Sequence, residues 1–90
     1  MADSYTGPVR ISGGDGILLT TGAAALEIDH DIGGWKGVVQ TLRGTGVAGK
    51  ALVVEIEIPD GGKGRAQLTP VGEVGEKATS SVVGLGGQPF

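Results

Sequence analysis

The single histidine of the chain, His30, is the residue best suited to proton transfer, and it lies between Asp29 and Asp31. An imidazole changes charge near neutral pH, so a histidine beside carboxylates can act as a general base or a metal ligand. In a strand, however, neighbouring side chains point to opposite faces, so neither aspartate meets the imidazole from beside it. The alternation places His30 on the apolar face with Ile28 and Ile32. It is then either a core or rim residue or the one ionisable group lining a cavity.

Trp35 follows two glycines where a strand is expected to begin, and two interpretations are open. A tryptophan can close one end of a β-barrel by filling volume, and its indole N–H then needs an acceptor. Alternatively, it can stack on a ligand. Tyr5 and Phe90 are the other aromatic residues and would complete such a plug. We take His30, Trp35 and Tyr5 as the ligand-binding candidates and assign no catalytic residue, metal ligand or cofactor.

The segment Gly44-Thr45-Gly46-Val47-Ala48-Gly49 matches the G-x-G-x-x-G pattern of dinucleotide-binding loops. That mechanism requires a helix directly after the loop, because the helix N-terminus holds the pyrophosphate. Here the following residues, Lys50–Ile58, alternate like a strand. The chain is also too short for the two-half fold that surrounds such a loop. We interpret the segment as a flexible connection between strands.

Two other groups of polar residues have simpler explanations than chemistry. Glu55 and Glu57 share one face of an expected strand, but Ca²⁺ needs six or more oxygens that converge from a bent loop. A solvated strand face is the favoured interpretation. Ser80 and Ser81 lack the G-x-S-x-G turn of a nucleophile, and nothing in the sequence brings His30 near them.

The clearest pattern of the chain predicts an antiparallel hairpin over Leu52–Leu68. Apolar residues at every second position, Leu52 to Ile58, alternate with Val53, Glu55 and Glu57. The residues from Pro59 to Lys63 then supply turn chemistry, and the return strand places Ala66 and Leu68 on one face. Period-two alternation on both sides of a Gly/Asp turn is typical of a hairpin with one buried face.

Clusters of glycine separate further segments of strand length along the chain. The predicted strands are Tyr5–Ser12, Ile17–Thr21 continuing into Ala25–Ile32, Trp35–Leu42, Ala51–Ile58, Arg65–Thr69 and Thr79–Leu85. Each has an apolar and a polar face, and closure into a ring would remove exposed strand edges. We therefore predict an all-β fold: one domain over residues 1–90, a small antiparallel β-barrel of about six strands with meander connections.

The composition excludes several classes of function. The formal net charge is −3 and the basic residues are scattered, so no positive field would attract nucleic acid. There is no cysteine, which excludes disulfides and thiol chemistry. No basic leader or long apolar run is present, and we expect a cytoplasmic chain without membrane contact.

Four segments follow an order that resembles a known family: Tyr5-Thr6-Gly7-Pro8-Val9, Gly34-Trp35-Lys36-Gly37, Asp60–Ala66 and Val83–Phe90. They look like those of small actinobacterial β-barrel domains of unassigned function, which occur alone or fused behind flavin-dependent monooxygenases. The resemblance spans nearly the whole chain. Its motifs are mostly glycine, proline and one aromatic residue, so it implies a fold more than a chemistry. It also implies an oxidoreductase as a partner.

Two functional hypotheses follow. The leading one is a non-catalytic accessory or assembly module that acts through protein–protein contacts or self-association, expected as a homodimer or larger. The alternative is a small-molecule-binding barrel, such as a cyclase- or isomerase-like enzyme of secondary metabolism, with Trp35 and His30 at its mouth. A barrel of six strands leaves little interior volume once branched side chains point inward, which favours the first hypothesis.

Overall fold

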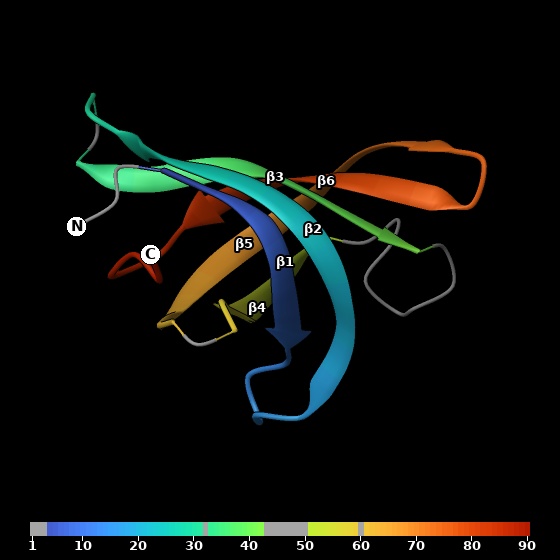
Figure 1. The fold of residues 1–90 in the computed structure, drawn as a ribbon, viewed down its shortest axis with the longest axis horizontal. Coiled ribbons are helices and arrows are strands. Elements are labelled where there is room, and N and C mark those ends of the chain that lie inside the picture. Colours follow the sequence, from blue (N-terminus) through green and yellow to red (C-terminus); the bar gives the residue numbers. More distant parts are fainter. Residues whose placement is uncertain (1–3, 32, 43–50, 60) are drawn as a thin grey trace.

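The structure is a computed structural model that describes residues 4–31, 33–42, 51–59 and 61–90. Within these residues the chain forms six strands and no helix (Figure 1). The strands are β1 (Ser4–Ser12), β2 (Leu18–Asp29), β3 (Gly34–Leu42), β4 (Leu52–Glu57), β5 (Lys63–Val74) and β6 (Lys77–Gly84). Every pair of neighbours is antiparallel, and the sheet closes into a ring. The predicted all-β barrel is therefore confirmed.

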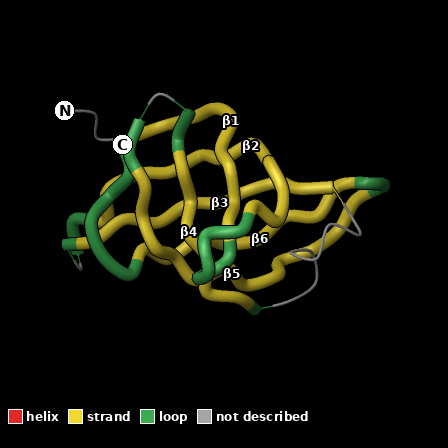
Figure 2. The backbone as a smooth tube through the Cα atoms, turned by 90° about the horizontal axis from the view of Figure 1, so that it is seen from below, coloured by secondary structure: helices red, strands yellow, loops and turns green. Residues whose placement is uncertain are grey.

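The order of strands around the ring differs from the predicted meander. It is β1-β2-β3-β6-β5-β4, so β3 lies beside β6 and β4 lies beside β1 (Figure 2). The edge of β3 that a meander would give to β4 is occupied by β6, from the pair Lys36 and Val83 to the pair Leu42 and Lys77. The prediction of meander connections was wrong because alternation determines which face of a strand is buried and does not determine its neighbour.

The interior is filled by branched side chains and one tryptophan. The buried apolar residues are Val9, Ile11, Ala24, Leu26, Trp35, Val39, Val54, Ile56, Ile58, Ala66, Leu68, Ala78 and Val82. They alternate with exposed or half-buried positions along the strands, as expected for a sheet with one dry face. The buried face predicted for the hairpin, which includes Val54, Ile56, Ala66 and Leu68, is confirmed.

The hairpin between β4 and β5 forms as the sequence predicts. Glu57 pairs with Lys63, and the connection is closed by hydrogen bonds from the Ile58 N–H to the Gly62 carbonyl (3.0 Å) and from the Gly61 N–H to the Ile58 carbonyl (2.8 Å). The return strand is longer than predicted, since β5 continues through Pro70 to Val74.

The extra length of β5 belongs to a hairpin with β6 that extends away from the barrel (Figures 1 and 2). The described pairing of β5 with β4 ends at Leu68, opposite Leu52. Pro70 lies beyond this pair, where a register shift between Pro70 and Gly72 interrupts the pairing with β6, and a proline is tolerated at such an irregularity. The predicted strand, Arg65–Thr69, covers only the first part of β5.

Candidate functional site

His30 lies in the turn between β2 and β3, and its side chain is exposed. The expectation that it shares the apolar face of a strand was wrong, because β2 ends at Asp29. The Asp29 carboxylate accepts a hydrogen bond from the Asp31 N–H (3.0 Å), and the Asp29 carbonyl accepts one from the Gly33 N–H (2.9 Å). Gly33 has a φ of +72°, which favours glycine. The sequence signal for this turn was Asp29 followed by Gly33.

The two aspartates beside His30 differ in burial and in their contacts. The Asp29 carboxylate is mostly buried and lies 3.7 Å from Nζ of Lys36 on the next strand. Asp31 is exposed. Ile32, expected beside His30, lies outside the described residues. This turn therefore brings an exposed imidazole to the surface without enclosing it.

Trp35 fills one end of the barrel, as the plug interpretation predicted. Only 1% of its surface is exposed, and its indole Nε1–H donates to the Gly86 carbonyl (3.1 Å). Phe90 packs edge-on against the indole, with ring centroids 6.2 Å apart and an interplanar angle of 87°. Two inward positions beside the ring are glycines, Gly64 and Gly84. A Cβ at Gly64 would lie 2.9 Å from Cζ2 of Trp35, and one at Gly84 would collide with the pyrrole side of the indole.

Tyr5, the third ligand-binding candidate, is half-buried and packs against the core. Its hydroxyl donates to the Pro8 carbonyl (2.6 Å) on its own strand. The hydroxyl hydrogen of Tyr5 is therefore used in a bond within its own strand. The structure thus places Trp35 inside the barrel, Tyr5 at the edge of the core and His30 in an exposed turn.

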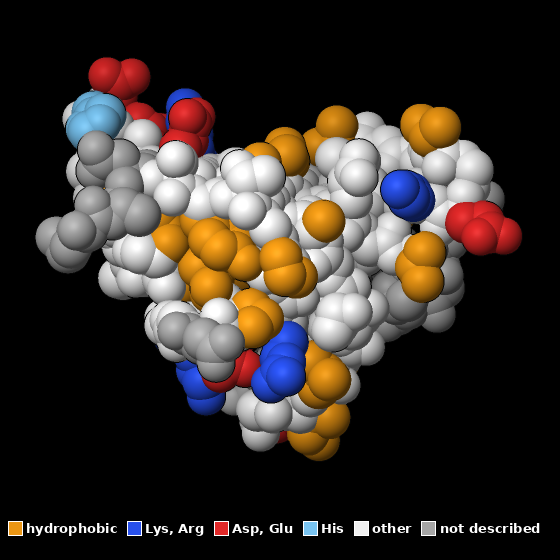
Figure 3. Space-filling view, viewed as in Figure 1, with side chains coloured by type: hydrophobic (Ala, Val, Ile, Leu, Met, Phe, Trp, Pro, Cys, Tyr) orange, Lys and Arg blue, Asp and Glu red, His pale blue; other side chains and the backbone are white. Residues whose placement is uncertain are grey.

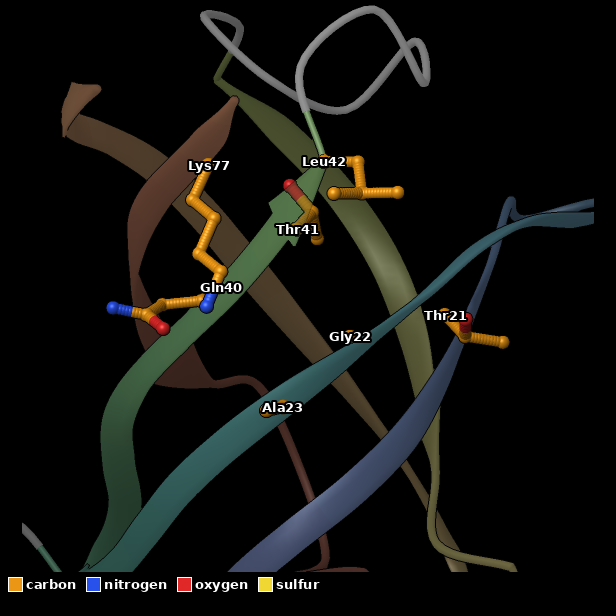
Figure 4. Close-up of a pocket in the computed structure, with 7 residues that line it drawn as sticks. All are labelled: Thr21, Gly22, Ala23, Gln40, Thr41, Leu42 and Lys77. Atoms are coloured by element: carbon orange, nitrogen blue, oxygen red, sulfur yellow. The ribbon is translucent and has the colours of Figure 1, made fainter. Parts of the chain in front are cut away.

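We describe three surface hollows formed by the described residues, and His30, Trp35 and Tyr5 do not line these three. The first opens where β2 and β3 separate beyond the pair Ala23 and Gln40, and its volume is about 170 Å³ (Figure 4). It is lined by Thr21, Gly22, Ala23, Gln40, Thr41, Leu42 and Lys77. Ligand pockets of proteins usually span about 300–1,000 Å³, so this hollow is small.

Thr41, beside the first hollow, carries a buried polar atom. Its side chain is buried, and Oγ1 has no hydrogen-bond partner among the described residues. The methyl group of Thr41 faces Gly22, where an added Cβ would lie 3.1 Å from Cγ2. The hydroxyl is therefore a local defect in the packing at this end of the barrel.

The second hollow, of about 310 Å³, lies over β4 and β5 and is lined by Gly14, Val53, Val54, Glu55 and Arg65. The third, of about 360 Å³, lies on the outer side of β1, β2 and β3. It is lined by Ser4, Thr6, Ala25, Leu26, Glu27, Gly37 and Val38. Ala25 and Gly37 form its floor, and their small size leaves the hollow open.

Catalytic or metal-binding groups do not converge in the described residues. No group of three His, Asp or Glu side chains among them could hold a metal ion. Ser80 is buried inside the barrel and pairs with Val39, whereas His30 lies beyond the start of β3 at Gly34. At about 3.3 Å per residue the separation along the sheet is about 16 Å or more, too far for a nucleophile and its base. The G-x-G-x-x-G segment, residues 44–49, lies outside the described residues.

A surface feature that the sequence interpretation missed is an uncharged outer face across four neighbouring strands. One row of outward side chains joins Thr6, Ala25, Val38 and Ser81, and a second joins Pro8, Ala23, Gln40 and Thr79. We call these eight residues the outer face. Figure 3 shows no charged side chain where β1 and β2 cross the middle of the view.

The sequence contained a signal for this outer face. The eleven residues 16–26 and the six residues 37–42 carry no charge. In a strand with one buried face, the other positions are usually polar or charged, so long uncharged stretches mark an outer face without charge. Hydrophobic alternation identifies the buried positions of a strand and does not distinguish a charged outer face from an uncharged one.

None of the described residues forms a helix that is long and apolar enough to cross a membrane. Comparison of the chain with family models, with curated proteins and with solved structures found no match.

Proposed function

We propose that this chain is a non-catalytic assembly module that works by self-association through its outer surface. The observation that carries the proposal is the contrast between a filled interior and an apolar exterior. The large apolar side chains that are exposed are Ile17, Leu18, Leu19, Val38, Leu42, Val53, Val71, Val74, Val83 and Leu85. Where such side chains lie next to one another on a surface, they mark contact surfaces more often than solvated ones.

The filled interior supports the same proposal. Trp35, Ile11, Ile56, Leu68, Val9, Val39 and Val82 have almost no exposed surface. Their packing leaves the indole N–H of Trp35 bonded to Gly86 and its ring against Phe90. An aromatic residue held in this way on two sides has little freedom to stack on a ligand.

Less supports the alternative of a small-molecule-binding barrel. That hypothesis requires a hollow beside His30, Trp35 or Tyr5, and the three hollows described above are lined by other residues. A cyclase or isomerase also needs groups that move protons within reach of one substrate. The one histidine is exposed in a turn, away from these hollows.

A second copy of the chain is the partner that we propose first. A small barrel has a limited core, and burial of outer apolar surface against another copy is an economical way to gain stability. An oxidoreductase, which the resemblance of the sequence implies, is the partner to be tested second.

The proposal is tested by thermal unfolding at several chain concentrations. Association stabilises the folded chain by mass action, so the midpoint temperature should rise with concentration. Unfolding can be followed by the fluorescence of Trp35, because this residue is buried in the folded chain and becomes exposed on unfolding. A midpoint that stays constant over a hundredfold dilution, together with a monomeric mass, would reject self-association.

A further inference from the structure

The outer face has a pattern that is complementary to itself. In the row that joins β2 and β3, Ala25 lies beside Val38, and in the next row Ala23 lies beside Gln40. Each row therefore has a small side chain on β2 and a larger one on β3. A twofold axis parallel to the strands and between β2 and β3 would place each small side chain opposite the larger one of a second copy.

The third hollow provides the space for such a contact. It lies over Ala25 and Gly37, and its volume is about 360 Å³. Val38 is 44% exposed and projects from the neighbouring strand. Under the twofold axis, Val38 of the second copy points at Ala25 and enters this hollow, while Val38 of the first copy does the same in return. Because alanine and glycine floor the hollow, a valine side chain can enter it without displacing a larger one, as sheet-to-sheet packing requires.

Charged residues lie at both borders of the outer face: Arg10 and Lys77 one row beyond Pro8 and Thr79, and Glu27 and Lys36 one row beyond Ala25 and Val38. The charges at the second border obey the same symmetry. Glu27 on β2 pairs in register with Lys36 on β3, and both side chains point outward. The twofold axis places Glu27 opposite Lys36 of the second copy, and Lys36 opposite Glu27. Glu27 has no ion pair with another described residue, and the Lys36 side chain is 49% exposed although it lies near Asp29. Two intermolecular ion pairs would form, each between Glu27 of one copy and Lys36 of the other.

The net charge of the chain favours the outer face over charged parts of the surface as the contact between two copies. Each copy has a formal net charge of −3, so two copies repel one another unless they meet where like charges are absent. The outer face is uncharged, and its Glu27–Lys36 border carries one charge of each sign. Like charges placed opposite one another in an interface cost far more than rim ion pairs contribute.

From these observations we infer that a second copy of this chain docks on the outer face, with a twofold axis along the β2–β3 seam, Val38 seated over Ala25 and Glu27 paired with Lys36. The inference rests on the proposed self-association and names its surface. It predicts an isologous dimer, in which every contact occurs twice.

Charge reversal at the border tests the inference. Glu27→Lys should place two lysines opposite one another, and Lys36→Glu two glutamates, so each single variant should raise the dimer dissociation constant by about tenfold or more. The double variant Glu27→Lys/Lys36→Glu restores opposite signs and should return the constant to within about threefold of the original. Glu76→Lys makes the same charge change in the exposed turn between β5 and β6 and should have no effect.

A second variant tests the packing without charge. Ala25→Leu fills the hollow at an exposed strand position, so the fold should be retained while Val38 of the second copy is excluded. We expect the dissociation constant to rise by about tenfold or more. Circular dichroism of each variant verifies that the strands are intact, and all constants are measured by sedimentation well below the unfolding temperature.

The outcomes separate the two levels of the proposal. If the unaltered chain dimerises and neither the charge reversals nor Ala25→Leu weakens the dimer, the outer face is not the interface and self-association still holds. If the unaltered chain is a monomer, the proposed function fails and this inference fails with it. Weakening by both single reversals without recovery in the double variant would also overturn the proposed pairing of Glu27 with Lys36.

Discussion

The indole of Trp35 occupies the space that a side chain at Gly84 would need. A Cβ at Gly84 would collide with Nε1, Cδ1 and Cε2 of the ring. The ring also packs edge-on against Phe90 and donates a hydrogen bond from Nε1 to the Gly86 carbonyl. Glycine at this position is therefore a requirement of packing, and the plug of the barrel depends on it.

Gly84→Ala should lower the free energy of unfolding by about 1–3 kcal/mol, because the added methyl group must displace the indole. Gly86→Ala is the matched control, since an added Cβ there meets no atom within 4 Å and the carbonyl that accepts from Trp35 is retained. That variant should stay within about 0.5 kcal/mol. Denaturant unfolding measures both. Equal losses in the two variants would contradict the packing account of Trp35.

The adjacent residues Ile56 and Glu57 test the two faces of the hairpin. Ile56 is fully buried, so Ile56→Ala should cost about 2–5 kcal/mol of unfolding free energy. Glu57 is half-buried and lies 3.8 Å from Arg10 and 3.9 Å from Lys63. Partly exposed ion pairs contribute little, so Glu57→Ala should cost no more than about 1 kcal/mol. Urea titrations measure both losses. A comparable loss from the two changes would refute the assignment of Ile56 to the buried face of β4 and Glu57 to the outer one.

The sequence allowed prediction of the strands and of their buried faces, because both depend on local alternation. β1 and β4 begin and end within one residue of the predicted bounds, and the plug of Trp35 with Phe90 was predicted from residue type. The order of the strands was not predictable in this way. The pairing of β3 with β6 and of β1 with β4 joins segments that are distant in the chain, and alternation contains no information about it.

Two local predictions were wrong. His30 was placed in a strand because alternation was given more weight than turn chemistry, and the strand predicted over Arg65–Thr69 covers only the first part of β5. The Asp29 carboxylate terminates β2 by accepting the Asp31 N–H. Pro70 is accommodated by the register shift between Pro70 and Gly72 in the pairing of β5 with β6. The turn after Asp29 is local and had a signal in the sequence, whereas the register shift at Pro70 depends on how β5 pairs with β6.

Thr41→Val should increase the free energy of unfolding by about 1 kcal/mol. The change keeps the shape of the side chain and removes a buried hydroxyl that has no hydrogen-bond partner among the described residues. Thr69→Val, at an exposed position on β5, is the control and should be nearly neutral. A loss of more than about 1 kcal/mol would instead indicate that the hydroxyl bonds to a molecule held in the small hollow.

His30→Gln should leave the unfolding free energy within about 0.5 kcal/mol of the original, because the side chain is exposed in a turn. The ring signals of His30 in NMR spectra should not respond when flavin mononucleotide is added. The chain has one histidine, so these signals need no assignment. A saturable shift on addition of the flavin would contradict the assembly module and support the ligand-binding barrel.

Sedimentation equilibrium of the unaltered chain, from low micromolar to millimolar concentration, tests self-association most directly. The account predicts a mass that rises from that of one 90-residue chain toward twice that mass, with a single dissociation constant at all rotor speeds. Salt should weaken the association, since two ion pairs border the proposed interface. A mass that remains that of one chain throughout the series would contradict the account.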